Sequence, residues 1–318
     1  GELFMAFWDD VVKGAGDLAN GTVKAVGNGF NATTKAVGDV AGSAGKEIDK
    51  VVNGAKGKFD AKPEEVAMQV LEQVSKLPVV KVDRNQFLMD KFGKGLSQEE
   101  VGKLLADGPV NIVSKDKLDK AAKACIMDNV LLSSGASVLA GLPGGIAMAV
   151  TIPADVAQYY AMALKLAQEL GYIYGFQYLW SEKDKLTEEA QNTLLLYLGV
   201  MLGVSGTGAL LRAGGMAIGK QALRSIPQKA LTKTLYYPIL QKVLKVFGIS
   251  LTKGTFAKGV SKVLPVVSGV ISGGITFATM KPMGENLQKE LSKMIDYNEE
   301  QYEKDVKSIR KEAEVIED

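Results

Sequence analysis

AQNTLLLYLGVMLGVSGTGALL, residues 190–211, is the stretch on which the fold depends, because none of its 22 side chains carries a charge. Two further stretches are uncharged in the same way, residues 129–154 and residues 263–280. With 26, 22 and 18 residues in chain order, each is long enough, or nearly so, to cross the hydrocarbon core of a bilayer. Each also contains the pattern G-x-x-x-G, which lets two helix backbones approach closely, at Gly141 and Gly145, Gly199 and Gly203, and Gly269 and Gly273.

These stretches have two interpretations. If they span a membrane, the lysine-rich chain between the second and the third is a cytoplasmic loop. If they are helices enclosed by the protein itself, the pattern looks the same, since Gly, Ser, Thr and Pro dilute their hydropathy below that of typical spanning helices. We prefer the buried core and keep insertion as the alternative.

The amino-acid composition excludes several classes of catalytic and metal site. The 318 residues include no histidine and one cysteine, Cys125. Ser-His-Asp and Cys-His nucleophilic sites, His-ligated metals and intrachain disulfides are therefore excluded. The run GGMAIGK at residues 214–220 is followed by Gln221, where a phosphate-binding loop needs Ser or Thr. We expect no metal and no cofactor, and the absence of a signal peptide near the N-terminus favours a cytoplasmic location.

Helix signals recur along the rest of the chain. Pro63 opens a predicted helix over residues 63–77, and Ser97 with Glu100 forms a capping box before a second helix. A third begins near Ser114. Strand signals are limited to short runs such as residues 79–82. The predicted class is all-α: a helical bundle with a Gly-rich apolar core, a long N-terminal amphipathic helix and a charged C-terminal helix.

Residues 11–54 repeat with a period of eleven. This period keeps one stripe on one side of a slightly unwound helix. Nine glycines weaken that helix, so an isolated helix should be largely unfolded in water and needs an apolar partner. The segment resembles the lipid-surface helices of synuclein-like and perilipin-like proteins, and packing on protein or self-association are the alternatives. The apolar stripe includes Phe7, Val11, Leu18, Val26, Val37 and Ile48, and Lys13, Lys24, Lys35 and Lys46 recur every eleven residues in a separate column.

Charge is distributed unevenly. Residues 190–284 contain eleven Lys and Arg and no Asp or Glu, whereas the chain from Glu285 onward has eleven carboxylates and six bases. The basic block should be attracted to an anionic phospholipid leaflet, a nucleic acid or the protein's own acidic tail. Nucleic acid is the least favoured, since the lysines are spread among apolar residues. The block includes Arg212, Lys220, Arg224, Lys229, Lys233 and Lys281.

Asp155 follows 26 uncharged positions, which draws attention to it as a catalytic residue. Pro153 places it in a first helical turn, however, where a negative charge complements the helix dipole, and we prefer that role. Aromatic residues gather after it, and they either line a lipid interface or pack in a core; they are Tyr159, Tyr160, Tyr172, Tyr174, Phe176, Tyr178 and Trp180.

The block LSSGASVLAGLPGGIAMAVTIPADVAQYYAMALKLAQELGYIYGF, residues 132–176, resembles the EcsC family in its Gly-rich apolar segment, its Pro-Ala-Asp step and its aromatic, Gln-containing helix. Phe176 replaces the usual Trp of that family. The run from Lys229 to Gly284 is also similar, so the resemblance covers roughly residues 62–295. It implies little about activity, because the biochemical role of the family is poorly defined.

These observations predict three regions: the repeat at residues 1–60, an EcsC-like helical domain at 61–295 and an acidic C-terminal helix at 296–318. We expect a non-catalytic protein, peripheral to or partly inserted in a membrane, whose repeat and basic block contact anionic lipid and whose Gly-rich core accepts or enters lipid. A lipid-acting enzyme using Asp155 and a pore-forming protein are the alternatives.

Overall fold

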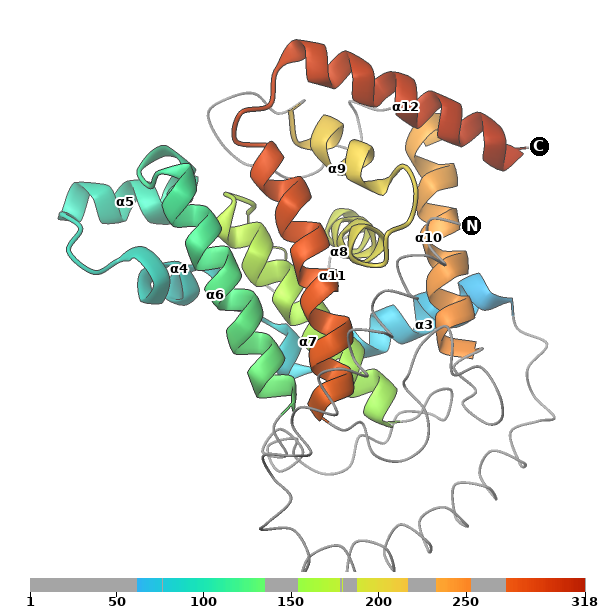
Figure 1. Cartoon of the computed structure of the whole chain (residues 1–318), viewed down its shortest axis with the longest axis horizontal. Helices are drawn as coiled ribbons and strands as arrows, with labels where there is room; N and C mark the ends of the chain where they lie inside the picture. Colours follow the sequence, from blue (N-terminus) through green and yellow to red (C-terminus); the bar gives the residue numbers. More distant parts are fainter. Residues whose placement is uncertain are drawn as a thin grey trace, which may run out of the picture.

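The computed structural model describes residues 62–75, 77–134, 154–177, 179, 188–216, 233–252 and 273–317. These residues contain helices and no strand, which confirms the all-α prediction (Figure 1). The repeat, Gly141, Gly145 and Gly269 lie outside the described residues. The helices are α3 (Pro63–Ser75), α4 (Arg84–Phe92), α5 (Gln98–Asp107), α6 (Lys115–Ser134), α7 (Ala154–Ile173), α8 (Glu188–Met201), α9 (Thr207–Met216), α10 (Lys233–Thr252), α11 (Gly273–Lys293) and α12 (Glu299–Glu317).

Local capping explains where the early helices begin and end. Ser97 and Glu100 form the predicted capping box at the start of α5, and Gly108, with a φ of 82°, ends that helix. The strand signal at residues 79–82 is wrong, because Pro78 starts a short 3-10 helix there. The sequence signals also missed α4, which is capped by the side chain of Asp83.

Residues 190–211 form the centre of the bundle. Figure 1 shows α8 end-on, enclosed by α7, α9, α10 and α11, and each of these four helices contacts it. Ten of the 14 residues of α8 are buried, and its exposed residues lie in the polar first turn, at Glu188 and Glu189. The chain turns after Met201 and continues as α9, so in this structure the stretch forms two core helices, in agreement with the preferred interpretation. Across the described residues, no helix combines the length and hydropathy that crossing a membrane requires.

The two glycines of the central G-x-x-x-G do different things. A Cβ at Gly199 would lie 2.6 Å from a methyl carbon of Val243 on α10, so glycine is what lets α8 and α10 approach. A Cβ at Gly203 would meet nothing within 4 Å, and this residue, with a φ of 69°, reverses the chain after α8. The prediction of close packing is therefore right at Gly199 and wrong at Gly203.

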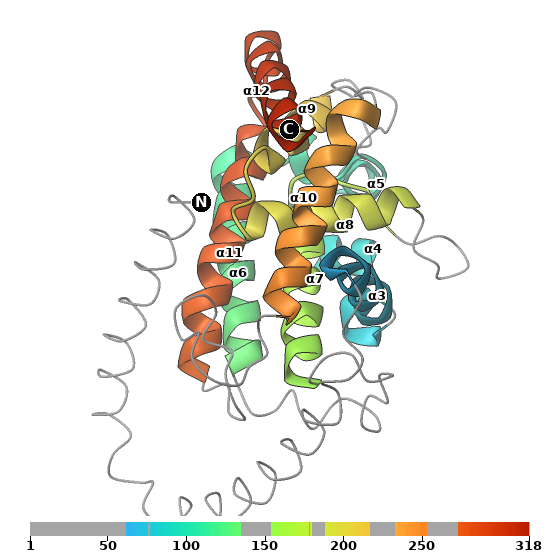
Figure 2. The same cartoon turned by 90° about the vertical axis from the view of Figure 1, so that its right-hand side faces the viewer.

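The directions of the helices follow from the side chains that join them. Ser292, near the end of α11, donates a hydrogen bond to Asp119, near the start of α6 (3.1 Å). At the other extremity, Tyr159 early in α7 donates to Thr279 early in α11 (3.0 Å). α11 is thus antiparallel to α6, and its first turns lie beside the last turns of α6 and the first turns of α7 (Figures 1 and 2).

α10 and α3 reach the same extremity. The rings of Tyr160 on α7 and Phe247 on α10 meet edge to face, with centroids 4.7 Å apart. The carbonyl group of Pro63, the first residue of α3, fills the space that a side chain at Gly248 would need. We call this extremity of the bundle the basal end: the last turns of α6 and α10 and the first turns of α7, α11 and α3.

Candidate functional site

The basal end is where three stretches of chain outside the described residues join the bundle. The chain up to residue 61 enters at α3, residues 135–153 connect α6 to α7, and residues 253–272 connect α10 to α11. We call these stretches the basal segments. The first contains the repeat, the second has no charged residue, and the third has three lysines and no carboxylate. On α6, close to this end, Leu131 leaves 59% of its surface exposed.

The aromatic residues near the basal end belong to the core. Tyr159 and Tyr160 are 5% and 3% exposed. Tyr159 donates a hydrogen bond to Thr279, and burial raises the pKa of Tyr159 above the ordinary value for tyrosine. Tyr172, Tyr174 and Phe176, at the other end of α7, are also buried. Packing, rather than an interfacial belt, is therefore the role of these five residues, and Tyr178 and Trp180 lie outside the described residues.

Asp155 lies in the first turn of α7, as predicted, and the structure describes its backbone only. Glu169 follows fourteen residues later on the same helix. At 1.5 Å per residue the two positions are roughly 21 Å apart along the axis. Asp155 and Glu169 therefore do not form one acid-base site.

A buried polar cluster occupies the interface between α6 and α7, and sequence reasoning missed it. Glu169 accepts hydrogen bonds from the thiol of Cys125 (3.2 Å) and from the amide of Asn129, and forms an ion pair with Lys165. Lys165 also donates to the side-chain oxygen of Asn129 (3.0 Å). The only signal in the sequence is that Cys125 and Asn129, like Lys165 and Glu169, are spaced i, i+4 and so share a helix face.

The thiol of this cluster is held in its protonated form. Burial raises the pKa of Cys125 well above its ordinary value, and the negative charge of Glu169 raises it further. Cys125 is 1% exposed. Because the thiolate is the nucleophile, Cys125 is an inert packing residue in this conformation, even though it stands next to a carboxylate and a lysine.

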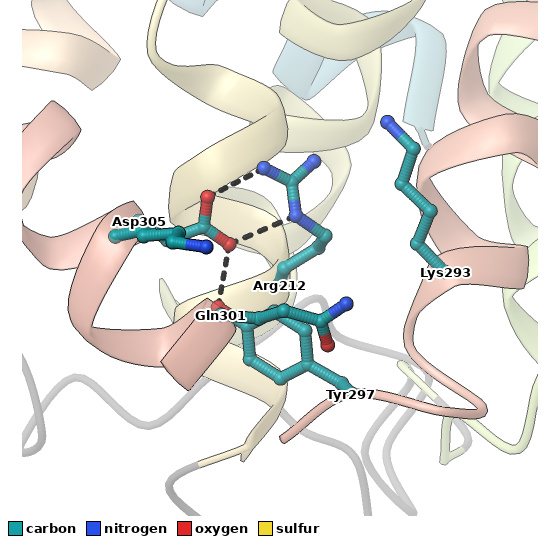
Figure 3. A pocket seen from close by; sticks show the side chains of 6 residues that line it. Arg212, Lys293, Tyr297, Gln301 and Asp305 are labelled. Carbon is teal, nitrogen blue, oxygen red and sulfur yellow. Dashed lines mark hydrogen bonds and ion pairs between the residues drawn. The ribbon is translucent and has the colours of Figure 1, made fainter. Parts of the chain in front are cut away.

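At the opposite end of the bundle, the basic block meets the acidic C-terminal helix (Figure 3). Arg212 on α9 donates two hydrogen bonds to Asp305 on α12 (2.9 and 2.6 Å) and forms an ion pair with Glu290 on α11. Tyr297 donates to the same Asp305. A cavity of about 200 Å³ lies beside this network, lined by Arg212, Lys293, Tyr297, Gln301, Lys304 and Asp305.

The structure describes four side chains of the basic block, Arg212, Lys242, Lys245 and Lys281, and three of them pair with carboxylates. Lys242 on α10 pairs with Glu312 on α12, and Lys281 pairs with Glu285 within α11 (2.8 Å). The protein's own acidic tail thus binds Arg212 and Lys242. The side chain of Lys233, at the start of α10, is outside the described residues, as are Lys220, Arg224 and Lys229 in the chain between α9 and α10.

Comparison of the chain with protein-family profiles, curated proteins and solved structures gave no match. The resemblance to the EcsC family stays a prediction.

Proposed function

We propose that the protein is a non-catalytic, membrane-associated helical protein that binds an anionic lipid surface through the basal segments. The observation that carries the proposal is their common attachment: the repeat and two uncharged or purely basic stretches all join the bundle at its basal end. A protein with its apolar segments on one end contacts a bilayer with that end alone.

The repeat supplies the apolar contribution. Burying about ten Val, Leu, Ile and Phe side chains contributes roughly 1.5–3 kcal/mol each. This outweighs about 1 kcal/mol for each of the nine glycines in residues 11–54. Packing of the stripe on the bundle is less favoured, since the described helices expose few large apolar side chains: Met68, Leu131, Tyr237 and Val315.

Lysines in the basal segments supply the preference for anionic lipid. Lys253, Lys258 and Lys262 lie in the stretch between α10 and α11, which has no carboxylate to neutralise them. Each lysine near an anionic leaflet contributes about 1 kcal/mol, and salt screens this attraction. Arg212 and Lys242, by contrast, already have carboxylate partners at the other end of the bundle.

Vesicle flotation tests the proposal. The full chain should float with vesicles that contain phosphatidylserine, float less with phosphatidylcholine alone, and lose binding when the chain begins at Asp60. Replacing Lys253, Lys258 and Lys262 by Gln should weaken binding to the anionic vesicles. The matched control replaces Lys103, Lys117 and Lys120, three exposed lysines away from the basal end, and should float like the unaltered chain. Equal recovery of the full and shortened chains in the unbound fraction would reject the proposal.

A further inference from the structure

α12 is held to the bundle differently from the other helices. Among its described side chains, Asp305, Ile309 and Ala313 are buried, one every four positions along a single stripe. Tyr302 and Val306 are partly buried against the core, and most of the others are exposed. One of the three buried residues is charged. α8, by comparison, buries ten residues, none of them charged. An outer helix with few fully buried apolar residues opens more easily than a central helix such as α8.

Two ion pairs flank the apolar contacts of α12. Asp305 forms an ion pair with Arg212 on α9, and Glu312 forms an ion pair with Lys242 on α10. Seven residues, or two helical turns, separate the two carboxylates, so both lie on the inner face with Ile309 between them. The surface that α9 and α10 present to α12 is therefore apolar along its middle, with one cation toward each end of the contact.

We propose that this α9–α10 surface is a docking site for an acidic amphipathic helix of a partner protein, and that α12 occupies it here as an internal ligand. The surface would recognise the pattern found in α12. Counted from a first carboxylate, this pattern has an aliphatic residue four positions later, a second carboxylate seven positions later and a small residue eight positions later, as in Asp305, Ile309, Glu312 and Ala313. Charge complementarity selects the acidic helix, because an occupant that lacks the carboxylates leaves Lys242 partly desolvated without its counter-charge and leaves Arg212 with Glu290 of α11 alone.

The connection allows the exchange. α12 is the last described helix and is joined to α11 only through residues 294–298. Its release therefore breaks its contacts with α9 and α10 and leaves the packing of α8 in place. The site also lies away from the basal end (Figures 1 and 2), so the inference does not depend on lipid binding.

The test uses a fluorescent synthetic peptide of residues 299–317 as the probe and the full chain as the receptor. In the unaltered chain α12 competes with the probe. The apparent affinity for the probe is therefore the intrinsic affinity multiplied by the fraction of molecules in which the site is open. The double variant Asp305→Asn with Glu312→Gln weakens the internal helix, and we expect it to bind the probe at least about tenfold more tightly. A probe carrying the same two substitutions should not bind.

The matched control is Glu303→Gln with Glu314→Gln, which removes the same charge from exposed positions of α12. It should bind the probe like the unaltered chain. Glu312→Gln alone is the milder variant should the double variant fold poorly, and it should shift affinity in the same direction by a smaller factor.

Hydrogen exchange of α12 separates the outcomes. Faster exchange in α12 of the double variant together with tighter probe binding supports the proposal. Faster exchange without probe binding overturns it, as does equal binding to all variants. Dimers of the unaltered chain that the probe dissociates would overturn the assignment to a separate partner, since a second copy would then supply the helix.

Discussion

At the scale of single residues, Cys125 is a thiol that the fold protects. It is 1% exposed, and burial together with the charge of Glu169 raises its pKa. A raised pKa leaves little thiolate at mildly alkaline pH, so a disulfide-exchange reagent should modify the native protein slowly and the unfolded protein at once. Ser308→Cys, at an exposed position of α12, provides the rapid control. Complete modification of native Cys125 within the time needed for the control would contradict the burial.

The carboxylate of Glu169 is the centre of the polar cluster, since three donors converge on it. Glu169→Gln keeps the shape but removes the charge that Lys165 faces, and we expect a loss of about 1–3 kcal/mol in the free energy of unfolding. Urea unfolding measures this. The control is Glu99→Gln, which breaks an exposed i, i+4 pair with Lys103 and should leave the midpoint unchanged. An unchanged midpoint for Glu169→Gln as well would show that the cluster does not stabilise the fold.

The polar cluster around Glu169 also shows which part of the site could not be predicted from the sequence. The spacing of Cys125 and Asn129, and of Lys165 and Glu169, shows that each pair shares a helix face. Nothing local in the sequence says that those two faces meet, because that depends on the packing of α6 against α7. The pairing of Arg212 with Asp305 was foreseen only as one of three destinations for the basic block, since net charge does not specify which partner it meets.

At the scale of elements, glycine has opposite consequences in two helices. Gly199→Ala would place a methyl group 2.6 Å from Val243 and 2.7 Å from Thr207, which forces α8 and α10 apart. Overpacking of this kind costs about 1–3 kcal/mol. Gly102→Ala on α5 meets nothing within 4 Å and should stabilise the helix by up to about 1 kcal/mol. Thermal unfolding should therefore give shifts of opposite sign, and two shifts of the same sign would refute the packing of α8.

α12 should loosen in acid. Burial opposes ionisation of Glu312, but hydrogen bonds from Lys242 and Ser205 outweigh it, and the pKa of Glu312 lies below its usual range. A carboxyl group with a depressed folded-state pKa stabilises the fold above its unfolded pKa, and this contribution is lost as pH falls through the folded value. Hydrogen exchange of α12 relative to α8 should thus rise between about pH 5 and about pH 3. Glu312→Gln should show a smaller rise, and an equal rise would place the titrating group elsewhere.

Helix boundaries were predictable where capping chemistry is local, as at Pro63, Ser97 and Asp107. α4 was missed because only Arg84 and Leu88 are buried on it, which leaves no apolar periodicity to read. The break between α8 and α9 was missed for another reason. Gly203 and Gly206 take positive φ angles there, yet in the sequence they look like the packing glycines on either side.

At the scale of the whole molecule, the two ends of the bundle have different chemistry. The basal end receives the repeat and two segments without carboxylates, whereas α12 closes the other end with ion pairs. The basic block therefore pairs with the acidic tail at one end, whereas its three lysines at the other end lie in a segment, residues 253–272, that has no carboxylate. Under the proposed function, this asymmetry predicts that the molecule meets a membrane with its basal end and that α12 faces the water.

The same asymmetry predicts that the repeat and the bundle behave as separable parts. A chain beginning at Asp60 retains all the described helices, so its thermal unfolding midpoint should match that of the full chain. Circular dichroism should show a gain of helix when anionic vesicles are added to the full chain, because the glycine-weakened repeat orders on an apolar surface. The shortened chain should show no gain, and high salt should reduce the gain in the full chain by screening its lysines. A full chain whose helix content is already complete as a monomer in plain buffer, and does not change with vesicles, would mean that the repeat takes its order from the protein and not from lipid.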